Sequence, residues 1–264
     1  MTEIPRTATD PDWRGLLDGW DRQQTGYIPQ REHMFTLMVD IVHAVLGDDL
    51  LVLDLACGPG AVSERLLARL PRARSVAIDM DPVLLAIGRG AFDTLGGRLR
   101  WVDQDLRDPD WTKAVGDQPF DAVLTTTALH WLSPEDLTAT YRRIAAILRP
   151  GGLMLNGDRL RFDDRSRTCG EVTDALTRIR DESASAQDSI DNWDDWWRSV
   201  SLRPTMARLV EERARRFSHP DDESKPTFRR PTLAFHLGAL ADAGFREMET
   251  MWQDLDRRLL LAVR

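Results

Sequence analysis

One short stretch limits the possible folds more than any other part of the sequence. Residues 51–55 (Leu-Val-Leu-Asp-Leu) have strand character, and the turn Ala56-Cys57-Gly58-Pro59-Gly60 follows them directly. Large apolar residues then recur at positions 62, 66, 67 and 70, which is the spacing of one helix face. A glycine turn between a strand and a helix presents backbone N–H groups and a helix N-terminus to a ligand. The stretch therefore predicts an α/β domain with a ligand site at this turn.

Four further segments of strand character follow, three of them apolar and one, 98–102, alternating between polar and apolar residues, and helical patterns separate most of them. The segments cover 75–79, 98–102, 120–124 and 153–155, and helices are expected after Asp81-Pro82 and Ser133-Pro134. Strands that alternate with helices of this length form right-handed βαβ units around a parallel sheet. Two C-terminal strands, 245–253 and 257–264, are joined by a short connection and indicate a hairpin. We therefore expect a doubly wound, mostly parallel sheet.

The segment 158–230 departs from this alternation. It is polar, contains helical fragments at 171–179 and 206–216, and holds Trp193, Trp196 and Trp197. We expect a helical cap inserted after the fifth strand. It would separate a core of residues 1–157, including N-terminal lid helices, from a last helix and hairpin at 231–264. The tryptophans either line an apolar pocket for a ligand in the cap or pack the cap onto the sheet. The second role is common for tryptophan, because an indole contributes strongly to any core.

Charge and cysteine content narrow the possible partners. The chain has 35 basic and 43 acidic residues, and the formal charge of -8 argues against a nucleic-acid-binding surface. Two cysteines are too few for a disulfide framework. The polar N-terminus is unlike a signal peptide, and no apolar run reaches membrane-spanning length. We expect a cytoplasmic protein with no nucleic-acid or membrane partner, and the oligomeric state stays open.

A second acidic position points to a nucleoside ligand. Asp79 ends the second strand, 19 residues after Gly60, at the spacing where a carboxylate accepts hydrogen bonds from ribose hydroxyls. The turn reads A-x-G-x-G, whereas a nicotinamide site has G-x-G-x-x-G and a P-loop ends in Gly-Lys-Ser/Thr. The pattern therefore departs from both dinucleotide and triphosphate sites.

Five motifs in order resemble those of the class I S-adenosylmethionine-dependent methyltransferases. Asp54-Leu55-Ala56-Cys57-Gly58-Pro59-Gly60 is similar to the first motif, with Ala56 in place of its first glycine. The other four lie at 77–82, 103–106, 120–132 and 148–152, and the resemblance covers about 27–157 and 231–264. It implies a Rossmann-like fold with seven strands, mostly parallel, and an antiparallel last strand. It also implies S-adenosylmethionine as the cofactor and S-adenosylhomocysteine as its product, with no metal ion.

The resemblance implies roles for the residues around the adenosine. Asp79 should hold the ribose and Met80 should pack against adenine, although methionine is also a common gap-filler in cores. Asp105 should accept a hydrogen bond from the adenine amino group, with the N–H of Leu106 toward the ring. Asp79 has a plainer alternative, which is to cap a helix or end a strand.

The methionine end of the cofactor should face the first turn, at Ala56, Gly58 and Gly60. Asp54 should orient it, directly or through water, unless this carboxylate only caps a helix. Tyr27 and Arg31 precede the first strand, where related enzymes often close a lid over the cofactor's carboxylate. Arginine suits a carboxylate by bidentate geometry, and a solvated helix face is the alternative.

The methyl acceptor is expected near the end of the fourth strand. Thr126 should lie near the methyl group, and His130 could take a proton from an attacking oxygen or nitrogen. Alternatively, His130 only begins the next helix. Transfer needs little acid–base help, because a sulfonium is a strong electrophile and alignment supplies much of the rate. Thr125-Thr126-Thr127-Ala128 stands where base-methylating relatives have Asn/Asp-Pro-Pro-Tyr/Phe, which disfavours an adenine N6 acceptor.

We therefore expect an enzyme that transfers a methyl group to an O, N or C atom of a small organic acceptor, as in secondary metabolism. One alternative is an RNA or protein methyltransferase, because basic clusters occur at Arg213, Arg215 and Arg216 and at Arg229 and Arg230. Another is a protein that binds S-adenosylmethionine without transferring its methyl group.

Overall fold

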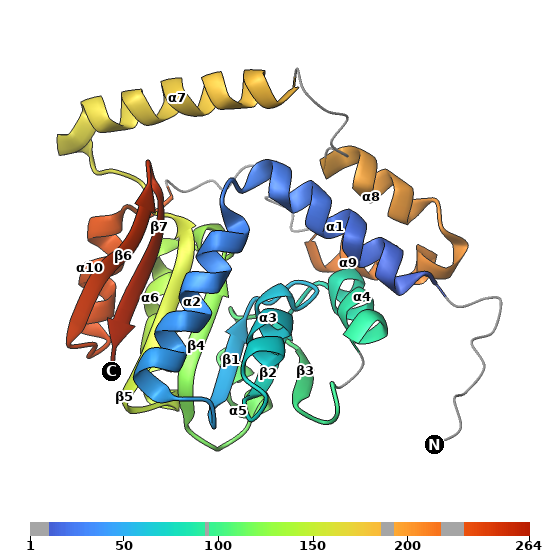
Figure 1. Ribbon diagram of the computed structural model, residues 1–264, viewed down its shortest axis with the longest axis horizontal. Helices are drawn as coiled ribbons and strands as arrows, with labels where there is room; N and C mark the ends of the chain where they lie inside the picture. The colour runs from blue at the N-terminus through green and yellow to red at the C-terminus, as the bar shows by residue number, and fades with distance from the viewer. Residues whose placement is uncertain (1–10, 93–94, 186–192, 218–229) are drawn as a thin grey trace.

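A computed structural model describes residues 11–92, 95–185, 193–217 and 230–264 (Figure 1). These residues contain a seven-stranded sheet with the strand order β3-β2-β1-β4-β5-β7-β6. The strands from β1 to β5 are parallel, and β7 is antiparallel to both β5 and β6. The expected Rossmann-like sheet with an antiparallel last strand is confirmed. The strands are β1 Leu51–Leu55, β2 Arg74–Asp79, β3 Leu99–Asp103, β4 Phe120–Thr126, β5 Leu148–Arg159, β6 Glu247–Asp254 and β7 Arg257–Val263.

Helices cover both faces of the sheet (Figure 1). One face packs against α2 Arg31–Leu46, α3 Ala61–Arg69 and α4 Pro82–Phe92, and α1 Trp13–Tyr27 lies against α4 in the same apolar cluster. The other packs against α5 Trp111–Val115, α6 Pro134–Ile147 and α10 Leu233–Asp242. Alternate strand residues enter the two cores: Val52 enters the first, and Leu53 enters the second. Burial on both faces explains why the central strands β1 and β4 are largely apolar.

The strand order reverses beside β1, which lies between β2 and β4. Ligands of doubly wound sheets bind outside the carboxyl ends of the strands at such a switch point. The turn that follows Leu55, the end of β2 at Asp79 and the end of β4 at Thr126 therefore share one edge of the sheet. The fold brings three of the predicted cofactor segments to this edge.

Strand β5 is longer than the sequence pattern predicts. The residues Arg149-Pro150-Gly151-Gly152 read as a turn, but they lie inside β5, opposite a register shift between Phe120 and Ala122 of β4. Gly151 has a φ of 75°, which lets the strand absorb the irregularity. At its other end β5 continues to Arg159, because residues 153–159 pair with β7. This continuation carries Asp158 to the ligand edge of the sheet.

In the described part of the segment between β5 and α10 lie three helices: α7 Arg167–Ser185, α8 Trp193–Ser201 and α9 Ala207–Phe217. Short 3-10 helices occupy Leu129–Trp131, Asp164–Ser166 and Pro204–Met206. Trp196 of α8 is 3% exposed, and its ring lies 5.0 Å from that of Trp20 in α1. This contact favours the packing interpretation of the tryptophans. Within the described ranges, no helix has the length and apolarity needed to cross a membrane.

Candidate functional site

The turn between β1 and α3 depends on left-handed backbone conformations. Ala56, Gly58 and Gly60 have φ values of 54°, 55° and 89°. A Cβ at Gly60 would lie 2.5 Å from the ring of Trp101, so this position admits only glycine. A Cβ at Gly58 would meet nothing closer than Leu84, at 3.8 Å. The backbone at Gly58 is therefore open to a close approach, beside the N-terminus of α3.

Asp79 connects this turn to the one after β2. Its Oδ2 accepts a hydrogen bond from the backbone N–H of Gly58 at 2.7 Å, and its Oδ1 accepts one from Asp81 at 2.8 Å. Burial raises the pKa of Asp79 to about 6. Each carboxylate oxygen can accept more than one hydrogen bond. The side chain can therefore fix the turn and still accept from a ligand hydroxyl.

Asp54 is bound to the first turn of α3. Its Oδ2 accepts hydrogen bonds from the backbone N–H of Ser63 at 2.9 Å and from the Ser63 hydroxyl at 2.7 Å. The same hydroxyl lies 2.8 Å from that of Ser75 in β2. Burial raises the pKa of Asp54 to about 6. The helix-capping interpretation of Asp54 describes these contacts, and its contact with a cofactor stays a prediction.

The predicted adenine residues lie together at the ends of β2 and β3, with an arginine between them. Arg107 donates to both oxygens of Asp105, with Nη2–Oδ2 at 2.7 Å and Nε–Oδ1 at 3.1 Å. The same Nη2 lies 3.8 Å from the Sδ of Met80. Leu106 is buried. Arg107 is a neighbour of the site that the motif comparison does not single out, although it directly follows the acidic segment.

Helix α9 closes over the ends of β2 and β3 through two arginines. The Nε of Arg213 lies 2.6 Å from the Oδ2 of Asp81, and Arg216 donates to Asp103 at 2.5 Å and to the carbonyl of Met80 at 2.8 Å. The hydrogen bond with Asp103 raises the pKa of Arg216. Two of the basic residues that could have lined a nucleic-acid groove are therefore paired with carboxylates after β2 and at the end of β3, of which Asp81 is buried and Asp103 is exposed. Arg229 lies outside the described residues.

The predicted lid residues at the start of the chain are only partly described. Arg31 is buried, and its Nη1 lies 2.8 Å from the Oδ1 of Asp21 in α1. Its guanidinium also lies over the ring of Phe35, at 4.6 Å. Burial lowers the pKa of Arg31. Tyr27 ends α1, and its side chain lies outside the described part of the chain, so the lid contact with a cofactor stays a prediction.

His130 has a buried carboxylate partner on the neighbouring strand. Its Nδ1 lies 2.7 Å from the Oδ1 of Asp158, and its backbone N–H donates to Oδ2 at 3.2 Å. Burial opposes ionisation of Asp158, but the adjacent His130 lowers the pKa of the carboxyl below its ordinary value. A carboxylate that accepts from Nδ1–H leaves Nε2 of a neutral imidazole free to take a proton. Thr126 pairs with Gly157 in the sheet, so Thr126 and Asp158 lie on adjacent strands at the same edge.

Asp158 was not among the predicted site residues, although a signal for it exists. It follows the apolar run of β5 and is the last but one residue of that strand, much as Asp79 is the last residue of β2. Behind it, on the α6 and α10 side, the hydroxyl of Tyr141 lies 2.5 Å from the Nδ1 of His236. Both side chains are buried, and burial lowers the pKa of His236 to about 4. The acceptor side of the site therefore includes buried polar groups as well as His130.

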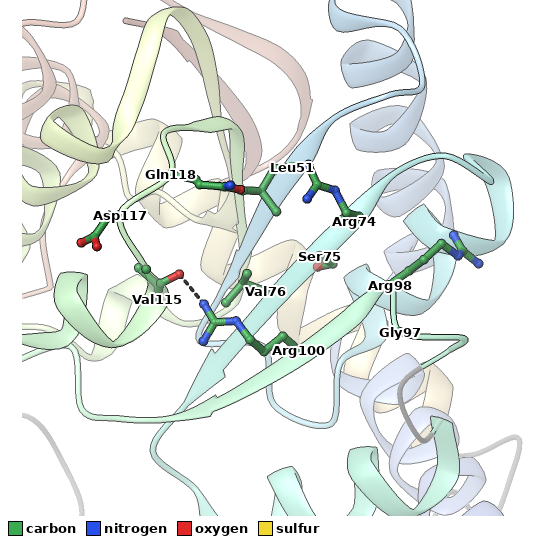
Figure 2. Close-up of a pocket in the computed structure, with 11 residues that line it drawn as sticks. Leu51, Arg74, Ser75, Val76, Gly97, Arg98, Arg100, Val115, Asp117 and Gln118 are labelled. Atoms are coloured by element: carbon green, nitrogen blue, oxygen red, sulfur yellow. Dashed lines mark hydrogen bonds between the residues drawn. The ribbon is translucent and has the colours of Figure 1, made fainter.

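A separate hollow of about 400 Å³ lies at the opposite, N-terminal edge of β1, β2 and β3. Arg74, Arg100 and Gln118 are among its lining residues, and Figure 2 shows Arg100 donating a hydrogen bond to the carbonyl of Val115. Asp117 points away from the other side chains in this view. None of the predicted site residues lines this hollow. It is distinct from the site at the carboxyl ends of the strands.

Known proteins match the part of the chain that holds the glycine turn. Residues 52–152 match the family model described as a methyltransferase domain. The trans-aconitate 2-methyltransferase of Azoarcus sp. (strain BH72) is 31% identical over 136 residues, which cover 51% of this chain and 49% of that protein. The carboxy-S-adenosyl-L-methionine synthase of Chromohalobacter salexigens is 31% identical over 120 residues, which cover 43% of this chain and 41% of that protein. The chain thus matches about half the length of these curated relatives or less.

Solved structures extend the likeness of the fold beyond the matched domain. An O-methyltransferase family protein from Burkholderia thailandensis aligns with 98% of this chain and 74% of its own, with a TM-score of 0.54. Its identity of 17% makes it evidence for the fold alone. The strand order, the turn after β1 and the match over residues 52–152 agree with one another. Residues 52–152 are therefore similar to a methyltransferase domain, and they lie within a Rossmann-like fold that is similar to that of known methyltransferases.

Proposed function

We propose that the protein transfers the methyl group of S-adenosylmethionine to an oxygen or nitrogen atom of a small organic acceptor, and that His130 takes the acceptor's proton. The observation that carries this proposal is the 2.7 Å contact between His130 and Asp158. It lies at the end of β5, two strands from the glycine turn that follows β1. Relatives named for trans-aconitate methylation support a small acceptor.

The residues at the ends of β1 to β3 suit the cofactor. S-adenosylmethionine, when bound, supplies a methyl group on a positively charged sulfur. Gly58 offers open backbone, and Asp79 keeps acceptor capacity for ribose hydroxyls beyond its two backbone contacts. Met80 and Asp105 flank Arg107 at the ends of β2 and β3, which supports a contact with adenine there, and α9 covers this end through Arg216.

The chemical contribution of the chain on the acceptor side is a positioned base. Asp158 fixes the His130 ring and stabilises the imidazolium that forms when Nε2 takes a proton. The imidazole side chain is 14% exposed, so it is held by the protein and still reachable. A positioned base of this kind contributes about 10²- to 10⁴-fold in rate. It serves an acceptor whose attacking atom carries a proton, such as a hydroxyl or an ammonium group.

Two features weigh against an RNA or protein acceptor. The formal charge of the chain is -8, and Arg213 and Arg216 are engaged with the carboxylates of Asp81 and Asp103. One of the relatives is named a carboxy-S-adenosyl-L-methionine synthase. A non-methylating use of the same domain is therefore an alternative that the experiment has to distinguish.

The test measures S-adenosylhomocysteine formed by the purified protein from S-adenosylmethionine with hydroxyl, amine and carboxylate acceptors. His130→Gln should lower kcat/KM about 10²-fold or more for any productive hydroxyl or amine acceptor. Asp158→Asn should lower it about tenfold or more, because the amide favours the wrong imidazole tautomer. Calorimetry should show unchanged affinity for S-adenosylmethionine in both variants.

His43→Gln is the matched control, because His43 is exposed in the last turn of α2. It should leave kcat/KM unchanged. Full activity of His130→Gln with every productive acceptor would remove the base from the mechanism. Tight binding of S-adenosylmethionine with no product from any acceptor would favour the non-methylating alternative.

A further inference from the structure

We propose that the acceptor is an aromatic hydroxy acid whose carboxylate binds Arg161 and Arg230, whose ring packs on Trp131, and whose hydroxyl faces His130. This inference rests on the proposed function and names the chemical class of its acceptor. Its evidence is independent of the cofactor residues, because all four side chains lie beyond the ends of β4 and β5 or at the entry to α10.

Arg159 ends β5, Arg161 follows it, and Arg230 lies near enough to both for their charges to act on it. Arg159 is paired with Asp256, with Nη2 and Oδ2 3.0 Å apart. The pKa of Arg230 is lowered, mainly by burial and then by the charges of Arg159 and Arg161. The nearby carboxylate of Asp158 acts in the opposite direction and raises the pKa. Among the residues that the structure describes, neither Arg161 nor Arg230 forms an ion pair. Asp158, the nearby carboxylate, is engaged with His130.

Like charges held near one another, here with Arg230 half-buried and Arg161 exposed, favour an anionic ligand. Guanidinium groups match a carboxylate by planar, bidentate geometry, and such charge-assisted hydrogen bonds are about twice as strong as neutral ones. The backbone holds the two arginines near each other, because Arg161 forms an isolated parallel bridge with Thr232 and accepts a hydrogen bond from Leu233. Arg230 lies two residues before Thr232 in the chain. The arrangement is therefore tied to the fold.

Trp131 connects this cationic pair to the base. Its side chain is 59% exposed, which is unusual for so large an apolar group. The ring of His130 lies 5.0 Å from the Trp131 ring, and the guanidinium of Arg230 lies over the same indole at 5.2 Å. The indole of Trp131 is thus a flat apolar surface that has the imidazole of His130 and the guanidinium of Arg230 as neighbours. An aromatic ring of the acceptor can stack on such a surface.

The base and the cations together indicate two different groups on one acceptor. A carboxylate that acted as the nucleophile would already be ionised and would give His130 no proton to take. A phenolic hydroxyl carries a proton, which the imidazole can remove as the oxygen attacks. The hydroxyl oxygen forms the new bond to the methyl carbon while the carbon–sulfur bond breaks and its electron pair stays on sulfur. The proton goes to Nε2 of His130, and the products are a methyl ether with a free carboxylate and S-adenosylhomocysteine.

Binding is tested by calorimetry on the full chain saturated with S-adenosylhomocysteine. The probes are 4-hydroxybenzoate, 3-hydroxybenzoate, 4-hydroxyphenylacetate and 4-hydroxycinnamate, each beside its neutral methyl ester. At least one acid should bind about tenfold or more tightly than its ester. Arg230→Gln should weaken binding of that acid by about tenfold or more and Arg161→Gln should weaken it less, while both leave the ester within about twofold. Arg142→Gln, an exposed arginine of α6, is the control and should change neither.

Product analysis separates this inference from the proposed function. Mass spectrometry should find the O-methyl ether of the bound acid and no methyl ester. The inference is overturned if every acid binds no better than its ester, if Arg230→Gln weakens acid and ester equally, or if the ester is the product. Methyl transfer to neutral phenols alone would keep the proposed function and overturn the acceptor class. Arginine-dependent binding of the acids without S-adenosylhomocysteine production would keep the acceptor site and overturn the methyl transfer.

Discussion

The two halves of the site differ in how their charges are matched. At the ends of β1 to β3, in the cofactor half, carboxylates are partnered by the chain itself: Asp79 by the Gly58 N–H, Asp81 by Arg213 and Asp103 by Arg216. Beyond the ends of β4 and β5, in the acceptor half, Arg161 and Arg230 have no ion pair within the described ranges. The cofactor half is thus largely complete without a ligand. The acceptor half keeps charge available for one.

The buried aspartates of the cofactor half and the buried histidine of the acceptor half have pKa shifts in opposite directions. Burial raises the pKa of Asp54 and Asp79 in the cofactor half to about 6. Burial lowers the pKa of His236 in the acceptor half to about 4. In both cases the fold favours the uncharged form, but an acid and a base reach that form at opposite ends of the pH scale. The two halves should therefore lose stability in opposite pH directions.

The largest expected effect is the opposite dependence of stability on pH in the two halves. It is measured first in the cofactor half. A carboxyl whose folded pKa exceeds its unfolded pKa stabilises the fold fully below about pH 4, and this stability is lost as the pH rises through about 6. For Asp54 the loss is about 3 kcal/mol. The free energy of unfolding of Asp54→Asn minus that of the wild type should therefore increase by about this amount from pH 4 to pH 8. Urea unfolding across that range measures it.

His236→Gln is the counterpart in the acceptor half. A histidine whose folded pKa lies below its unfolded pKa stabilises the fold above about pH 6.5, and this stability is lost as the pH falls through about 4. Gln can still form a hydrogen bond with the hydroxyl of Tyr141. The free energy of unfolding of His236→Gln minus that of the wild type should therefore increase as the pH falls. If the free energy of unfolding of either variant depended on pH as that of the wild type does, the contrast between the halves would be wrong.

The same contrast explains which parts of the site could be predicted from the sequence. The cofactor half consists of local features: the turn Ala56–Gly60 follows its own strand, and Asp79 ends the next one. Hydrophobic runs and turn residues locate such features directly. The acceptor half brings together His130, Asp158 and Arg230, which are far apart in the chain. Their proximity depends on the register of β5 with β4 and β7, and a single sequence does not specify that register.

Three residue types show where sequence reasoning ends. Asp158 was missed because the apolar run of β5 ends earlier than the strand, whose last residues are held by pairing with β7. Trp196 allowed both a pocket and a packing role, and only its burial against Trp20 separates the two. Arg213 counted as one more basic residue of a solvated cluster, because composition does not reveal which arginines meet a carboxylate of another element.

Asp79→Ala should have the next largest effect and tests the cofactor half directly. It removes the acceptor for ribose hydroxyls and frees the Gly58 N–H, so the affinity for S-adenosylmethionine should fall about 10- to 100-fold, or 1–3 kcal/mol. Calorimetry measures the affinity, and circular dichroism checks the fold. Asp117→Ala, at the opposite edge of the sheet, is the control and should bind normally. Unchanged affinity in a folded Asp79→Ala protein would exclude Asp79 from the cofactor site.

The smallest expected effect is on local stability. It is measured by replacing one arginine with glutamine in each half of the site. Asp81 is 5% exposed and its partner Arg213 is half-buried, so Arg213→Gln leaves a buried carboxylate without its ion pair. The loss should be about 1 kcal/mol, and amide hydrogen exchange in α9 should quicken accordingly. Arg230→Gln should leave exchange throughout the protein unchanged, because that guanidinium has no ion pair to lose within the described residues. The exposed neighbour Arg215→Gln is the control for a charge change in α9 itself.

This last comparison is decided by the pattern of exchange as well as by its size. If the arginine charges of both halves served stability alone, Arg213→Gln and Arg230→Gln would each quicken exchange in the elements they contact. If neither did, α9 would be held on α4 by its apolar contacts, and its arginines would add little. Quickened exchange confined to Arg213→Gln, together with lost acid binding confined to Arg230→Gln, would separate a charge used to close the site from a charge kept for its ligand.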